Sequence, residues 1–170
     1  GHWDKFKDEL FQITTREGHE FAMKPMNCPH HTQIYARKQH SYRELPQRYA
    51  NTTKVYRDEQ SGELAGLARV RAITQDDAHV FCRNGQVKKE ITAIWDIVTE
   101  FYGVFGFKLK HRLSLHDPKK MENYLGEEKS WLQAEENLRE IVKEKKVSAT
   151  EAIGEAAFYG PKLDFMAKDS

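Results

Sequence analysis

Side chains that can bind phosphate or metal ions gather in two short stretches of this 170-residue sequence. The first is KPMNCPHH (residues 24–31), where Cys28 stands between an asparagine and a proline and two histidines follow. The second is RVRAITQDDAH (residues 69–79), in which arginine, glutamine, aspartate and histidine fall mostly at every second position. Thiolate and imidazole are ligands that zinc prefers, and guanidinium groups match the geometry of phosphate.

Cys28 admits three interpretations. As a zinc ligand it would need a partner such as His79, because zinc takes cysteine sulfur together with histidine nitrogen. As a nucleophile it would need a nearby base, and no motif in the sequence singles one out. As a small buried residue it would need no chemistry, which is the commoner role of a lone cysteine. His30 and His31 are less favoured partners, since consecutive side chains at a helix start point in different directions.

Arginines flank a turn-rich loop in VYRDEQSGELAGLARVR (residues 55–71). Arg57 precedes the loop, and Arg69 and Arg71 follow it, so a hairpin would bring their guanidinium groups together. Such a cluster can clamp phosphates, and Glu59 could accept a hydrogen bond from an adenine amino group. The alternative is a surface hairpin with ordinary ion pairs, and spacing alone does not separate the two.

The pattern of apolar residues predicts an α+β fold in which helices flank an antiparallel β-sheet. A first helix should occupy roughly 28–40, since Pro29 suits a first turn. Next comes a hairpin at about 53–82. On its second strand, every second residue from Arg69 to Phe81 lies on one face, which is mostly polar and is a candidate pocket floor. The opposite face should pack on helices. Further expected elements are a helix at 86–104, a strand at 108–115, a helix at 125–146 and a strand within 158–165.

The remaining histidines and the second cysteine carry no such signal. Cys82 falls on the face opposite His79 and should pack rather than bind metal. Four histidines lie in charged or loop-like contexts and are expected at the surface: His19, His40, His111 and His116.

Composition narrows the class of protein. A net charge of +1 gives no overall attraction to nucleic acid, and the chain has neither a CxxC motif nor a basic stripe, which argues against a zinc-containing nucleic-acid module. Two cysteines rule out a disulfide framework and favour a reducing, cytoplasmic location. No apolar run approaches membrane-spanning length. The sequence stops without a stop signal, so we expect a piece of a longer protein.

Taken together, KPMNCP, SYRELPQRY, VYRDEQSGELAGLARVRAITQDDAHVF and AFYGPKLDF resemble the catalytic core of the threonyl-tRNA synthetase family. The resemblance covers nearly the whole chain. It implies the class II synthetase fold, with residues 1–170 as the first part of the catalytic domain. Motif 3 and the editing and anticodon-binding domains would lie outside this chain, and the full-length protein would be a homodimer.

The resemblance also implies a reaction: ATP with Mg²⁺ activates threonine to an adenylate, and the threonyl group is transferred to the 3′ end of its tRNA. By position, Arg57 would hold the α-phosphate, Glu59 the adenine and Arg69 the outer phosphates. Cys28 and His79 match two zinc ligands, and the zinc would bind the amino and hydroxyl groups of threonine. The other implied site residues are catalytic Gln75 and Lys162, threonine-binding Met26, Asp77 and Tyr159, and His2 near the terminal ribose of the tRNA.

The match has departures. The third zinc ligand would be a histidine beyond this chain, so we expect the 170-residue chain to bind zinc weakly and to be inactive alone. His30 stands where many relatives carry glycine, and Ala65 where some carry histidine. An alternative function is a catalytically inactive synthetase-like module that binds ATP or RNA. A seryl or prolyl relative would share the fold but not the pairing of Cys28 with TQDDAH.

Overall fold

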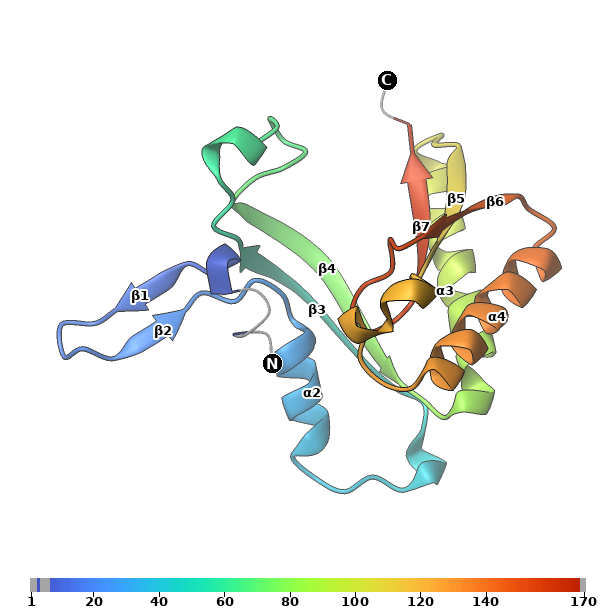
Figure 1. Cartoon of the computed structure of the whole chain (residues 1–170), viewed down its shortest axis with the longest axis horizontal. Helices are drawn as coiled ribbons and strands as arrows, with labels where there is room; N and C mark the ends of the chain where they lie inside the picture. The colour runs from blue at the N-terminus through green and yellow to red at the C-terminus, as the bar shows by residue number, and fades with distance from the viewer. Residues whose placement is uncertain (1–2, 4–6, 169–170) are drawn as a thin grey trace. The chain divides into compact units, whose positions relative to one another are not determined.

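A computed structural model describes residue 3 and residues 7–168 of the chain (Figure 1). The helices in this part are α2 (Cys28–Ala36), α3 (Asn84–Val104) and α4 (Glu128–Glu144). The strands are β1 (Gln12–Thr14), β2 (Glu20–Ala22), β3 (Gln47–Tyr56), β4 (Ala72–Phe81), β5 (Leu109–Leu115), β6 (Ala149–Ile153) and β7 (Lys162–Ala167). Short 3₁₀ turns are η1 (Lys7–Glu9), η2 (Tyr42–Glu44), η3 (Ser61–Glu63) and η4 (Pro118–Asn123).

The strands form three separate sheets. β1 pairs with β2 and β3 pairs with β4, both antiparallel, and the third sheet has the order β6-β5-β7. The predicted α+β class with antiparallel pairing is therefore confirmed. One pair was not anticipated: β5 and β6 run parallel, with α4 in the crossover between them. A parallel pair needs such a crossover, and α4 supplies it.

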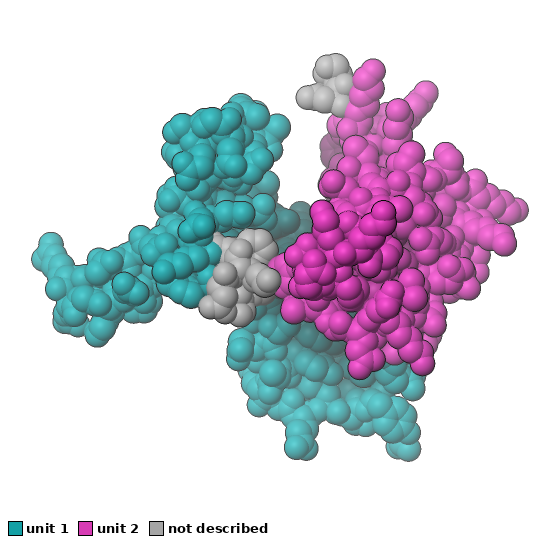
Figure 2. All heavy atoms as spheres, viewed as in Figure 1, with its two compact units in different colours: residues 1–83 teal, residues 84–170 magenta. Residues whose placement is uncertain are grey.

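The chain divides into two compact units, residues 1–83 and residues 84–170 (Figure 2). Across the described residues of both units, no helix is long and apolar enough to cross a membrane.

The first unit is built on the β3–β4 hairpin. Its ten-residue ladder runs from Gln47 opposite Phe81 to Tyr56 opposite Ala72, so β3 begins earlier than the predicted start at residue 53. α2 begins at Cys28, as predicted, with proline in its first turn, but ends at Ala36. The face of β4 opposite Gln75, Asp77 and His79 was expected to pack on helices, but most of it is exposed. The residues of that face that are exposed are Ala72, Thr74, Asp76 and Ala78.

The second unit carries the apolar core. Leu113 and Leu115 of β5 are each 2% exposed and pack with Leu138 of α4. On α3 the buried residues are Glu90 and Trp95, and Ile91 packs against the core, whereas Phe101 is 57% exposed. The predicted helix at 86–104 is confirmed, with the bounds Asn84–Val104.

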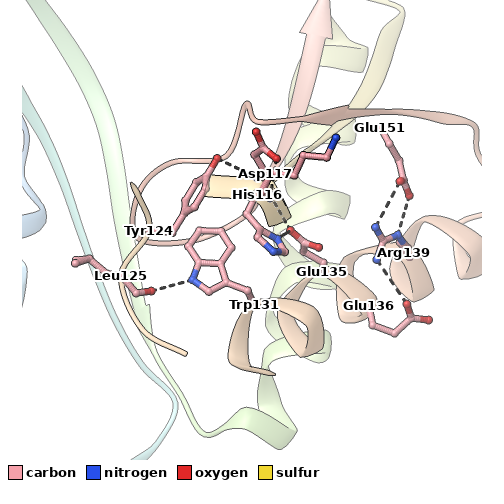
Figure 3. Close-up of polar contacts among 10 residues, drawn as sticks. His116, Asp117, Tyr124, Leu125, Trp131, Glu135, Glu136, Arg139 and Glu151 are labelled. Carbon is pink, nitrogen blue, oxygen red and sulfur yellow. Dashed lines mark hydrogen bonds and ion pairs between the residues drawn. The ribbon is translucent and has the colours of Figure 1, made fainter. Parts of the chain in front are cut away.

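Three of the four histidines expected at the surface are partly or fully buried, and only His19 is exposed. The side chain of His40 is 4% exposed, and His111 stacks on Trp95. His116 is 2% exposed and packs against α4 (Figure 3). Its sequence neighbours, HDPKK, are polar and typical of a loop, which is why the surface prediction was wrong.

A carboxylate of α4 binds the backbone N–H and the ring Nδ1 of His116, while the buried Nε2 has no hydrogen-bond partner among the described residues. Glu135, which is 3% exposed, accepts hydrogen bonds at one oxygen from the His116 backbone N–H at 2.9 Å and from the ring Nδ1 at 2.6 Å. Trp131, one helical turn earlier, packs on the same ring and donates from its indole nitrogen to the Leu125 carbonyl (Figure 3). Trp131, Glu135 and Leu138 are four and three positions apart, so they share one face of α4. Because the two apolar residues mark that face as buried, their spacing indicates in the sequence that Glu135 is a buried acceptor.

Candidate active site

The start of α2 and the polar face of β4 come together in the first unit. Asp77 and His79 are half-buried on β4, and the Asp77 carboxylate lies 3.9 Å from His79 Nδ1. Burial raises the pKa of the Cys28 thiol, and the negative charge of Asp77 raises it further. The structure therefore places three predicted residues in one corner, with Asp77 within electrostatic reach of both Cys28 and His79.

His31 is the functional candidate that the sequence interpretation passed over. It is 4% exposed, and its Nδ1 lies 2.7 Å from His79 Nδ1, with the two rings edge to face at a centroid distance of 4.8 Å. His30, next to it, is exposed. The sequence contained a signal for this, because residues three positions apart on a helix share a face. His31 therefore lies on the face of Cys28, whereas His30 does not.

The donor types in this corner suit zinc, but their number is small. Cys28 offers sulfur and His79 offers imidazole nitrogen, the pair that zinc accepts. Within residues 7–168, no group of three or more histidine, cysteine, aspartate or glutamate side chains is placed to hold a metal ion. The residues present thus fit zinc as two of its ligands, and with the raised pKa the metal-free Cys28 thiol stays protonated at neutral pH.

The KPMNC loop is tied to the hairpin by Lys24. Its ammonium group donates to Asn27 Oδ1 at 3.2 Å and to Thr53 Oγ1 at 2.7 Å, and the Tyr56 backbone N–H donates to the Lys24 carbonyl at 2.9 Å. Met26 is half-buried in the same loop. These contacts fix the loop, and with it the start of α2, against β3.

The hairpin loop brings the predicted nucleotide-binding residues together. The Glu59 side chain, 9% exposed, accepts from Arg69 Nε at 2.9 Å and lies 2.8 Å from a terminal nitrogen of that guanidinium group. This hydrogen bond holds the pKa of Glu59 below its ordinary value. Arg57 donates to the Pro25 carbonyl at 3.4 Å, so it lies beside the KPMNC loop. Arg71 donates to the Glu59 carbonyl at 3.0 Å.

The other predicted site residues are distributed differently. Gln75 is exposed on β4, opposite Thr53. Tyr159 and Lys162 belong to the second unit, where Tyr159 is 64% exposed in the turn before β7 and Lys162 begins that strand. His2 lies outside the described residues.

Comparisons with known proteins agree along the whole chain. A family model described as "tRNA synthetase class II core domain (G, H, P, S and T)" matches residues 11–170. A protein of Cytophaga hutchinsonii named "Threonine--tRNA ligase" is 51% identical over 173 aligned residues, which cover all of this chain and 27% of that protein. A protein of the same name from Flavobacterium johnsoniae is 47% identical, again over 100% of this chain and 27% of its own length.

A solved structure is also similar. The crystal structure of the RNA binding domain of threonyl-tRNA synthetase from Cryptosporidium parvum superposes with a TM-score of 0.87 at 37% identity, covering 100% of this chain and 41% of that one. The chain spans about a quarter of the length of the curated relatives it matches. With the family model matching residues 11–170, the chain belongs to the tRNA synthetase class II core domain family.

Proposed function

We propose that this chain forms part of the catalytic core of a threonine–tRNA ligase. The observation that carries the proposal is the corner of the first unit where Cys28, Asp77 and His79 come together, in a chain similar over its full length to proteins named threonine–tRNA ligase. Arg57 links the arginine-bearing loop to the KPMNC loop through the Pro25 carbonyl. The reaction would be ATP-dependent activation of threonine, followed by transfer to the 3′ end of tRNA(Thr).

The loop residues would bind ATP together with Mg²⁺. Arg57 would contact the α-phosphate, Glu59 the adenine amino group and Arg69 the outer phosphates, because guanidinium groups bind phosphate oxygens in a fork. Arg69 is paired with Glu59 in the structure. Nucleotide binding would therefore exchange this pair: Arg69 would turn to phosphate, and Glu59 would become available to the base.

The α2–β4 corner would select threonine. Cys28 and His79 would hold a zinc ion with a third ligand from outside this chain, and the bound ion would act as a Lewis acid for the amino and hydroxyl groups of the substrate. Asp77 would accept the hydrogen bond of the threonine hydroxyl. Valine cannot donate that bond and would leave a half-buried carboxylate unpaired. A site built to bind a hydroxyl group discriminates strongly against a substrate that lacks one.

The remaining residues that the resemblance implies would have the following roles. Gln75 and Lys162 would act on the adenylate, Met26 and Tyr159 would contact the amino acid, and His2 would lie near the terminal ribose of the tRNA. We further propose that the protein at its natural length is a cytoplasmic homodimer.

The test is threonine-dependent ATP–pyrophosphate exchange by the protein at its natural length. We expect exchange with threonine and little with valine, and a loss of roughly 100-fold or more in kcat/KM for threonine in Cys28→Ala. Cys82→Ala is the matched control, since Cys82 is the other cysteine and lies at the end of the hairpin. Nucleotide binding without any exchange would instead identify an inactive synthetase-like module.

Zinc binding by the 170-residue chain is a separate measurement. Because its described part offers two donors in the corner, equilibrium dialysis should give clearly less than one tightly held zinc per chain. One tightly bound ion per chain would contradict a ligand set that needs a third residue from elsewhere.

A further inference from the structure

The contact between His31 and His79 joins two ring nitrogens of the same kind. Their Nδ1 atoms are 2.7 Å apart, a distance that requires a hydrogen bond, and the edge-to-face angle of 80° between the rings is compatible with one. A neutral imidazole carries one N–H and one lone pair. In the neutral pair, therefore, only one of the two Nδ1 atoms can hold the proton.

The two arrangements of this proton have opposite consequences for His79. If His31 donates, His79 accepts at Nδ1 and must carry its own proton at Nε2, which leaves His79 without a free lone pair. If His79 donates from Nδ1, its Nε2 lone pair stays free. A histidine binds a metal ion through a nitrogen whose lone pair is free, and the hydrogen bond at the other nitrogen decides which one that is.

The charge beside the pair selects the second arrangement. The Asp77 carboxylate lies 3.9 Å from His79 Nδ1, too far for a hydrogen bond but close enough to favour an N–H dipole, rather than a lone pair, at that atom. Burial strengthens the preference, because His31 is 4% exposed and the side chains of Asp77 and His79 are 20% and 24% exposed.

We propose that His31 is a positioning residue: its Nδ1 accepts the Nδ1–H of His79 and thereby keeps the Nε2 lone pair of His79 free for the metal ion. The assignment to a metal site rests on the proposed function. The tautomer itself does not, and it can be measured in the metal-free chain. Cys28 keeps its proposed role as a zinc ligand, and Asp77 keeps its proposed role as acceptor for the threonine hydroxyl.

The first experiment is long-range ¹H–¹⁵N NMR on the metal-free 170-residue chain, which distinguishes the two neutral tautomers of each ring. We expect His79 with its proton on Nδ1 and His31 with its proton on Nε2. His31→Phe should reduce the Nδ1–H fraction of His79, and His31→Gln, whose amide oxygen can accept the bond, should restore part of it. His30→Phe, at the exposed neighbour, should leave the tautomer unchanged.

A wild-type His79 protonated on Nε2 would overturn the proposal, and so would a tautomer that His31→Phe and His31→Gln leave unaltered. The wild-type result decides even if the phenylalanine variant does not fold.

The second experiment measures zinc affinity of the protein at its natural length. His31→Phe should weaken binding by roughly 10- to 100-fold, with rescue by His31→Gln. An unchanged affinity would overturn the positioning role. If Cys28→Ala and His79→Ala leave zinc binding intact while the tautomer is as expected, the metal assignment fails and the tautomer stands. If those variants abolish binding while His79 is protonated on Nε2, the metal assignment stands and the role of His31 fails.

Discussion

Asp77 is the side chain that links the groups of the candidate site, since its charge adds to burial in raising the pKa of the Cys28 thiol and it lies 3.9 Å from His79 Nδ1. A single carboxylate in a half-buried corner therefore lies close to both a thiol and an imidazole. In the second unit the carboxylates of Glu135 and Asp164 have structural partners instead.

Removing the Glu135 carboxylate should cost far more than removing its neighbour. Glu135→Ala leaves the buried His116 backbone N–H and ring Nδ1 without their acceptor, and we expect the free energy of unfolding to fall by about 3 kcal/mol. Glu136→Ala is the control, because Glu136 is exposed and 3.8 Å from Arg139, and it should change stability by less than about 0.5 kcal/mol. Urea unfolding of both variants measures the difference; equal losses would contradict the role of the buried pair.

Asp164 should make the second unit sensitive to acid. Partial burial opposes ionisation, but hydrogen bonds from Ser114 at 2.6 Å and Arg112 at 3.1 Å hold the pKa of Asp164 below its ordinary value of 3.8. A carboxyl group with a lowered folded-state pKa stabilises the fold fully above 3.8, and this contribution is lost as pH falls through the folded value.

Asp164→Asn supplies the comparison. It should be less stable than the wild type by about 1 kcal/mol at pH 6, and the gap should close as pH falls below 3.8. Urea midpoints between pH 6 and pH 3 measure this; a gap that stays constant with pH would contradict it.

The elements show what the sequence could and could not predict. Apolar periodicity located α3, α4 and β5, and Pro29 located the start of α2, because these signals are local. The strand β6 and its parallel pairing with β5 were missed, since a partner distant in sequence decides both. The same holds for the site: residue types identified Cys28 and His79, whereas the burial of His31 needed the packing of α2 on β4.

Val55 anchors the β3–β4 hairpin. Its side chain is fully buried, so Val55→Ala should lower the free energy of unfolding of the first unit by about 2 kcal/mol. Its cross-strand partner Ile73 is 46% exposed, and Ile73→Ala should cost less than about 1 kcal/mol. Thermal unfolding, monitored by the near-ultraviolet signal of the tyrosines, compares the two; a larger loss at Ile73 would contradict the anchoring role of Val55.

At the scale of the whole molecule, apolar burial is unevenly divided. Among the described residues, the buried large apolar side chains of the first unit are Leu10 and Val55, whereas the second unit has six. Those six are Trp95, Leu113, Leu115, Trp131, Leu138 and Ile141.

The halves should therefore differ when each is expressed alone. Residues 84–170 have their own core and should unfold cooperatively in urea, whereas residues 1–83 should unfold at lower urea with a broad transition. Circular dichroism of each half measures this. A sharp, stable transition of residues 1–83 would show that polar contacts suffice for that unit.

The parallel pairing of β5 with β6 has a consequence for the order of folding. In the β3–β4 hairpin, paired residues are 16 apart at the loop end (72 minus 56) and 34 apart at the far end (81 minus 47), so the ladder can zip from its loop. Every β5–β6 pair is 38 apart (149 minus 111, 153 minus 115), which gives no short starting point. Pulsed hydrogen exchange during refolding should thus detect protection of β4 amides before those of β6. The β5–β6 ladder can form only after α4 has formed and shortened the span between the two strands.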